Sequence, residues 1–161
     1  MQREIKMKDV SNDLSRSVKA FYTRHDRTND IIASKRPQPN EWSLKEIIGH
    51  LVNSASNNQQ RFLGLQTVTE MQFPLYQKDH LDWIGIEKIN ELKFADLFLL
   101  WKQYNILIAH IIANIDASKL DNHLVMLDGR RIPLKAIAID YVRHLKDHLN
   151  QFEETHKKVS K

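Results

Sequence analysis

Two histidines, His144 and His148, stand four residues apart in the stretch DYVRHLKDHLNQ, which covers residues 140 to 151. Side chains at positions i and i+4 of a helix lie on the same face. Two neutral imidazoles placed in this way can bind one divalent metal ion. Hydrogen-bonded histidines in a protein core show the same spacing, so the pair by itself leaves both interpretations open.

The helix that carries this pair also has apolar side chains at Ile137 and Tyr141, and the pair continues their face. We therefore expect both imidazoles to point into the protein interior. A buried polar group without a partner costs about 1–3 kcal/mol, and a shared ion would satisfy both rings. A third histidine, His50, lies between Ile47 and Leu51 on another amphipathic segment. Three imidazoles converge if these two helices are neighbours.

The pattern of the whole chain is helical. Only four glycines and four prolines interrupt its 161 residues, and apolar residues recur at steps of three and four without a sustained alternation. We predict an all-α fold, a four-helix bundle with one long crossover connection between helices 2 and 3. The predicted helices cover 11–34, 43 to about 64, 94–115, and a segment that follows Asp128 and Gly129 and continues through Phe152.

Two of these helices have distinctive features. Ser43 and Glu46 have the spacing of a capping box, which predicts that the second helix begins at Ser43. We expect the third helix to be the most buried, because it is apolar on more than one side. In the fourth helix, Pro133 is compatible with a place in the first turn.

The long connection covers residues 66–93, and its apolar residues do not recur with a regular helical or strand spacing. A connection of this length in a compact domain is a functional loop, a crossover or a short helix. Tyr76, Asp79 and Trp83 are the residues in it that have most to offer a ligand. They can equally be loop residues that pack back onto the bundle.

Composition narrows the function further. There is no cysteine, so a metal ion would have to be held by His, Asp or Glu. The net charge is +4, but basic and acidic residues are interleaved, which argues against a nucleic-acid interface. We find neither a signal-peptide pattern nor a stretch long enough to span a membrane. We therefore expect a cytoplasmic protein that forms a single domain over 1–161, with no nucleic-acid or membrane partner.

Three segments resemble the DinB-like superfamily of four-helix metalloproteins, which includes the YfiT-type metal-dependent hydrolases. They are EWSLKEIIGHLVNS at 41–54, DYVRHLKDHLNQF at 140–152, and the lead-in DGRRIPLKAIAIDY. The resemblance implies that His50, His144 and His148 are the ligands of a divalent metal ion such as zinc or nickel. It also implies a homodimer, in agreement with the apolar third helix.

Three protein ligands leave a coordination position open, as in catalytic zinc sites. Water bound there would have a pKa near ~7 and could act as a nucleophile. The position could instead bind a substrate thiolate, since the resemblance includes both hydrolases and thiol transferases. Glu46 and Asp140 are candidate general bases by their spacing. Their alternative roles are structural: Glu46 in the capping box, and Asp140 as an acceptor that orients the His144 ring.

Two functions remain open at this point. The first is a metal-dependent hydrolase or thiol S-transferase that acts on a small molecule. The second is a non-catalytic bundle in which the metal is structural and the function is dimerisation or partner binding. Of the other histidines, His25 faces the interior and could approach the site, but a core role is the simpler interpretation. We expect surface or structural roles for the rest, which are His80, His110, His123 and His156.

Overall fold

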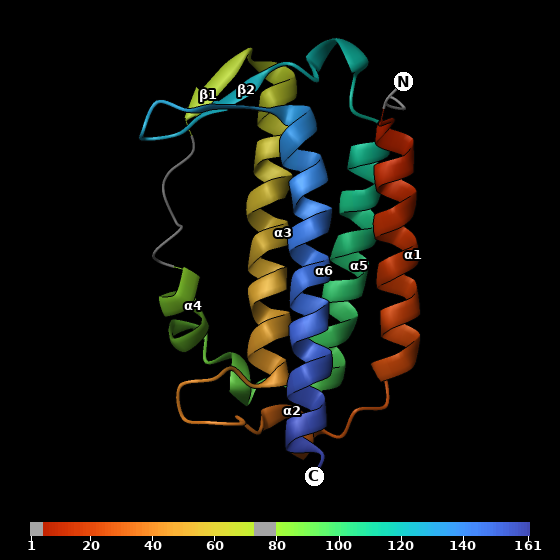
Figure 1. Cartoon of the computed structure of the whole chain (residues 1–161), viewed down its shortest axis with the longest axis vertical. Helices are drawn as coiled ribbons and strands as arrows, with labels where there is room; N and C mark the ends of the chain where they lie inside the picture. Colours follow the sequence, from red (N-terminus) through yellow and green to blue (C-terminus); the bar gives the residue numbers. More distant parts are fainter. Residues whose placement is uncertain (1–4, 73–79) are drawn as a thin grey trace.

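Four long helices form a bundle in the computed structural model, which describes residues 5–72 and 80–161 (Figure 1). They are α1 (Met7–His25), α3 (Leu44–Thr67), α5 (Phe94–Ala113) and α6 (Leu134–Val159). Each contacts two neighbours, in the order α1, α5, α3, α6 and back to α1. The all-helical four-helix bundle expected from the sequence is confirmed. The helices that carry the three histidines, α3 and α6, are neighbours.

The predicted first helix, 11–34, is wrong in its bounds. Helix α1 begins before residue 11 and ends at His25, and a separate short helix, α2 (Asp30–Ser34), follows it. The side chain of Asn29 accepts hydrogen bonds from the backbone amides of Ile31 and Ile32. Asparagine at this position caps the start of a new helix, so the chain turns here instead of continuing α1.

Helix α3 begins as predicted. The Ser43 hydroxyl accepts from the backbone amide of Glu46, and the Glu46 carboxylate accepts from the backbone amide of Ser43. The capping box is therefore complete. The helix continues to Thr67, past the predicted end near residue 64.

Helix α3, and not α5, is the most buried helix of the bundle. Fifteen of its 24 residues are buried, against eight of the 20 residues of α5. The prediction for the third helix is wrong because α2, α4 and the small sheet also cover α3, whereas the outer side of α5 faces solvent. Leu99, Leu100 and Leu107 on that outer side are 43%, 51% and 43% exposed.

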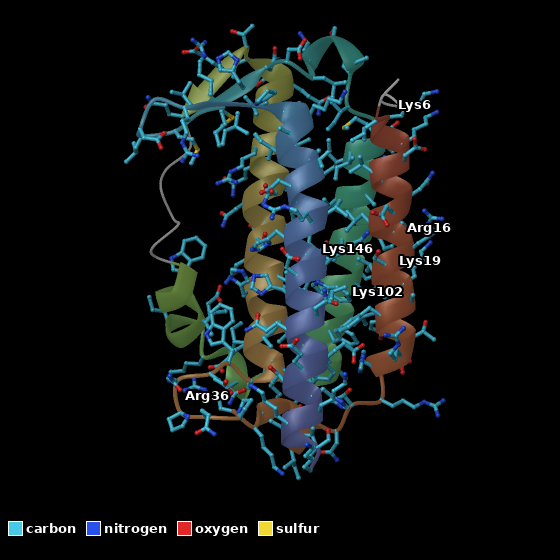
Figure 2. The ribbon with its side chains drawn as sticks, viewed as in Figure 1. Lys6, Arg16, Lys19, Arg36, Lys102 and Lys146 are labelled. Carbon is cyan, nitrogen blue, oxygen red and sulfur yellow. The ribbon has the colours of Figure 1, made fainter. Side chains whose placement is uncertain are left out.

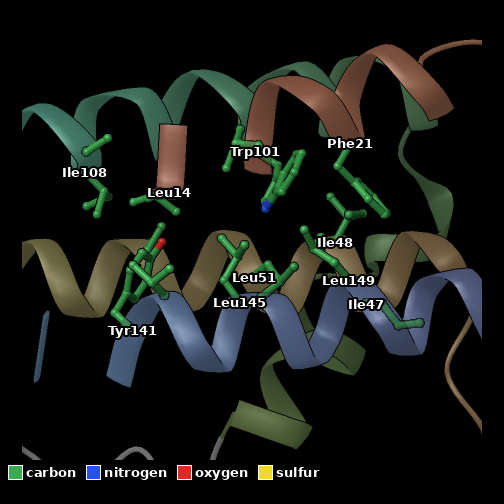
Figure 3. Close-up of a cluster of buried hydrophobic side chains, with 14 of the residues drawn as sticks. Leu14, Phe21, Ile47, Ile48, Leu51, Trp101, Ile108, Tyr141, Leu145 and Leu149 are labelled. Atoms are coloured by element: carbon green, nitrogen blue, oxygen red, sulfur yellow. The ribbon is translucent and has the colours of Figure 1, made fainter. Parts of the chain in front are cut away.

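The core lies along the axis of the bundle, where all four long helices contribute apolar side chains (Figure 3). The labelled contributors include Leu14 and Phe21 from α1, Ile48 and Leu51 from α3, Trp101 from α5, and Leu145 and Leu149 from α6. One polar pair lies within it. The hydroxyl of Tyr141 is 2.7 Å from Oδ1 of Asn105, to which it donates a hydrogen bond.

A three-stranded sheet closes one end of the bundle and was not predicted. Its strands are β1 (Glu70–Gln72), β2 (His123–Val125) and β3 (Arg131–Pro133), in the order β1-β2-β3. Strand β1 pairs with β2 in parallel, and β2 pairs with β3 in antiparallel orientation, so that Met71, Leu124 and Ile132 lie side by side. Pro133 ends β3 directly before α6 and is not in the helix's first turn.

The long connection contains the short helix that the sequence left as one alternative. Helix α4 (His80–Ile86) packs beside α3, and a 3-10 turn, η1 (Ile89–Glu91), follows it. Asn53 of α3 donates to the Glu87 carboxylate at 2.8 Å, which ties the end of α4 to α3. Tyr76 and Asp79 lie outside the described residues. In the part of the chain that is described, no helix has both the length and the apolar character of a membrane span.

Candidate metal centre

His50 is placed by the well-defined start of α3. Every residue of this helix from Leu44 to Leu51 is buried, because α2, η1, α5 and α6 surround this end. The residue before the histidine is Gly49, and a Cβ atom there would lie 2.7 Å from Cγ2 of Ile89. The glycine lets η1 pack directly against the α3 backbone. The backbone that carries His50 is thus held between the bundle and the connection.

His144 and His148 come from α6 and are half-buried. The fully buried face of this helix is formed by Tyr141, Leu145 and Leu149. The expectation that both imidazoles point into the interior therefore needs correction. They lie at the edge of the apolar face, where α6 meets α3 and His50.

The three imidazoles converge. Nε2 of His144 is 3.5 Å from Nε2 of His50 and 3.1 Å from Nε2 of His148. One ligand nitrogen from each ring lies within 4.8 Å of the others. Two histidines bound to zinc at tetrahedral angles have their nitrogens roughly 3.3 Å apart, given zinc–nitrogen distances of about 2.05 Å. The spacing of the ring nitrogens thus fits one shared ion.

Hydrogen bonds among the rings explain this arrangement less well. Nε2 of a neutral histidine carries either one proton or one lone pair. The Nε2 atom of His144 can therefore form a well-aligned hydrogen bond with only one neighbour. It nevertheless lies close to both His50 and His148. A cation placed between three lone pairs would satisfy all three nitrogens together.

The environment favours the neutral form that a metal ligand needs. Burial lowers the pKa of His144, and the nearby His148 lowers it further. A metal ion competes with protons for a histidine nitrogen, so a lower pKa leaves this ligand available at a lower pH.

Two further residues contact the histidines: Trp42, which belongs to the motif at 41–54 that carries the resemblance, and Gln151, which the sequence did not single out. The indole of Trp42 lies 5.1 Å from the ring of His50 and 6.4 Å from that of His148, measured between ring centroids. Gln151 places Oε1 at 2.7 Å from Nδ1 of His148. The spacing of three residues between His148 and Gln151, about one helical turn, was a signal that could have identified the glutamine.

Both oxygens of Glu46 are engaged. Besides the Ser43 amide, the carboxylate accepts from Arg36, which lies in the segment between α2 and α3 (Figure 2). Burial by itself would raise the pKa of Glu46, but the Arg36 guanidinium and the Ser43 amide more than offset it and hold that pKa below its ordinary value. Glu46 is thus an ionised, structurally committed carboxylate one turn from His50.

Asp140 lies on the solvent side of α6. Its side chain is 61% exposed and pairs with Arg143. This ion pair takes the place of the hydrogen bond to the His144 ring that the sequence suggested.

His25 does not join the three histidines. It is buried beside Phe21 and Phe152, and its Nε2 is 2.9 Å from the Glu153 carboxylate. His110 is exposed, as expected, and His123 has a structural place in strand β2.

No known protein-family profile and no curated protein matches the sequence. A comparison with solved structures gives YfiT from Bacillus subtilis, which is described as "a probable metal-dependent hydrolase with an unusual four-helix bundle topology". The match has a TM-score of 0.82 and covers 99% of this chain and 93% of YfiT. The chain has the YfiT-type bundle fold. With 14% sequence identity, the likeness concerns the fold alone, and it confirms the fold that the resemblance implied.

Proposed function

We propose that the protein is a metal-dependent enzyme that acts on a small molecule through a divalent ion held by His50, His144 and His148. The convergence of one ring nitrogen from each of the three histidines, all within 4.8 Å of one another, carries the proposal. The donor set consists of three neutral imidazoles, which suits zinc or nickel. When bound, such an ion polarises a substrate oxygen and lowers the pKa of the water that it binds.

Hydrolysis is the reaction that we favour over thiol transfer, because YfiT, which shares the fold, is described as a probable metal-dependent hydrolase. We assign no general base to the described residues. Glu46 is committed to Ser43 and Arg36, and Asp140 pairs with Arg143. Trp42 covers one side of the histidine group, so the substrate would meet an aromatic surface there.

Metal analysis of the purified protein tests the proposal. We expect about one zinc or nickel ion per chain, anomalous scattering at the three histidines in crystals, and loss of the ion in His144→Ala. His110→Ala is the matched control, because His110 is an exposed histidine on α5. A folded, unaltered protein that binds neither ion, or a His144→Ala protein that binds as well as the control, would contradict it.

We also propose that the protein is a homodimer that forms through the outer face of α5. Leu99, Leu100 and Leu107 are exposed there, and the helix has only two charged residues, Asp96 and Lys102. Apolar surface with few charges is typical of the core of a protein interface. A dimeric mass in light scattering that becomes monomeric in Leu100→Glu supports this, and a monomeric unaltered protein excludes it.

A further inference from the structure

The second ring nitrogen of His148 has a defined partner. Gln151 follows His148 by three residues on α6, and its Oε1 lies 2.7 Å from Nδ1 of the ring. This distance is short for a hydrogen bond between nitrogen and oxygen, so the contact is well formed. It lies on the side of the ring that faces away from His144, which contacts Nε2.

The orientation of the Gln151 amide in this contact determines which nitrogen of His148 carries the proton. A neutral imidazole has one N–H, and its position is set by the hydrogen bond that the other nitrogen makes. If Nδ1–H donates to the carbonyl oxygen of Gln151, Nε2 presents its lone pair to His50 and His144. If the amide were turned so that its NH2 group donated to Nδ1, Nε2 would carry the proton and could not bind a metal.

Gln151 also borders solvent. It lines a polar pocket of about 460 Å³ together with Trp42, whose ring stacks near His148. The other lining residues are Asn40, Glu41, Glu154, Thr155 and Lys158. Water in such a pocket can replace part of the hydrogen bond when the glutamine is removed, so we expect a moderate effect on metal binding.

We propose that Gln151 is a positioning residue of the metal site, which holds His148 as the Nδ1–H tautomer with Nε2 ready to bind the ion. This inference rests on the proposed function. Acceptors that hold metal-binding histidines in this way change metal affinity by 10–100-fold when they are removed. With partial replacement by water, Gln151→Leu should weaken zinc binding about tenfold. Gln151→Glu retains an acceptor oxygen and should bind zinc at least as tightly as the unaltered protein.

The first measurement uses metal-free protein. Long-range proton–nitrogen NMR spectra should show His148 as the Nδ1–H tautomer in the unaltered protein and in Gln151→Leu should show a shift toward Nε2–H. In Gln151→Glu the Nδ1–H form should persist. An unaltered protein with His148 as the Nε2–H tautomer would overturn the inference without any reference to metal.

The second measurement is zinc affinity by competition with a chelating dye. Gln60→Leu is the matched control, since Gln60 is an exposed glutamine on α3. A zinc affinity that is lower in Gln151→Leu and is restored in Gln151→Glu supports the inference. Equal weakening in both variants, or none in Gln151→Leu, overturns it. An unaltered protein that binds no zinc would instead overturn the proposed function, while the NMR result would still decide whether Gln151 sets the tautomer.

Discussion

The backbone amide of Ser43 donates a 2.8 Å hydrogen bond to the Glu46 carboxylate, and the same carboxylate pairs with Arg36. The first contact fixes the residue at which α3 begins, and the second ties the preceding segment to the helix. Since His50 follows within two turns, the same carboxylate helps to fix where along the bundle this buried imidazole lies.

The stability of the protein should fall in acid through Glu46. Because the folded-state pKa of Glu46 is lower than its ordinary value, its contribution is present above the unfolded pKa, near 4.5, and is lost as the pH falls through the folded value. Glu46→Gln should lower the unfolding free energy at pH 7 by about 1–3 kcal/mol and reduce this pH dependence. Denaturant unfolding between pH 3 and 7 measures both effects.

Asp140→Asn provides the control for that experiment. The Asp140 carboxylate is mostly exposed, and exposed ion pairs contribute little to the stability of the folded state. We expect nearly unchanged stability. Unchanged zinc affinity in both variants would agree with structural roles for the two carboxylates, whereas a loss of zinc-dependent activity in folded Glu46→Gln would reassign Glu46 to the chemistry.

Gly49→Ala should destabilise the protein although alanine favours helices. The new Cβ would lie 2.7 Å from Cγ2 of Ile89, a β-branched residue that cannot easily rotate away. Overpacking of this kind costs about 1–3 kcal/mol, more than the roughly 1 kcal/mol that alanine contributes to helix propensity. Thermal unfolding compared with Gly85→Ala tests this. A Cβ at Gly85 has no atom within 4 Å, so equal effects of the two substitutions would contradict the prediction.

Tyr141→Phe should destabilise the core by about 1–3 kcal/mol, because Oδ1 of Asn105 would lose the hydrogen bond that it accepts from this hydroxyl. Burial raises the pKa of Tyr141 far above its ordinary value, so the hydroxyl keeps its proton. Tyr104→Phe is the matched control. Its hydroxyl donates to Gln59 where water has access, so its loss should cost clearly less in the same urea titration.

Saturating zinc should raise the melting temperature of the unaltered protein, and excess chelator should reverse the rise. A ligand that binds only the folded state adds about 2.7 kcal/mol at 100 times its dissociation constant. Differential scanning calorimetry of His148→Ala should show no such increase. An equal increase in that variant would place the bound zinc elsewhere.

Local signals made much of the fold predictable. The capping box at Ser43 and Glu46 located the start of α3, and the apolar spacing identified the four long helices. Asn29 could also have been recognised as a helix-capping residue, but apolar residues continue at helical spacing after it and favoured one continuous helix. The sheet was not readable, because its strands are three residues long and β1 and β2 pair across fifty residues of sequence.

The site was predictable as far as helical spacing extends. His144 and His148 share a face by their spacing, and His50 joined them through the neighbouring helix and the resemblance. Trp42 was part of the motif at 41–54, but its contact with the histidine rings was not predicted, and Gln151 was missed because a glutamine on the flank of a helix is a common feature of soluble helices. Arg36 could not be assigned to Glu46, since that contact depends on how the segment after α2 folds back.

The sheet has a further consequence for the metal centre. It joins the segment after Thr67, where α3 ends, to the segment before Leu134, where α6 begins. The two helices that supply the ligands are therefore held together at one end by backbone hydrogen bonds before any ion arrives. When the helices are already in place, the binding free energy of the ion does not have to offset the entropy lost in bringing them together. Metal-free protein should stay folded, with its site preorganised for the ion.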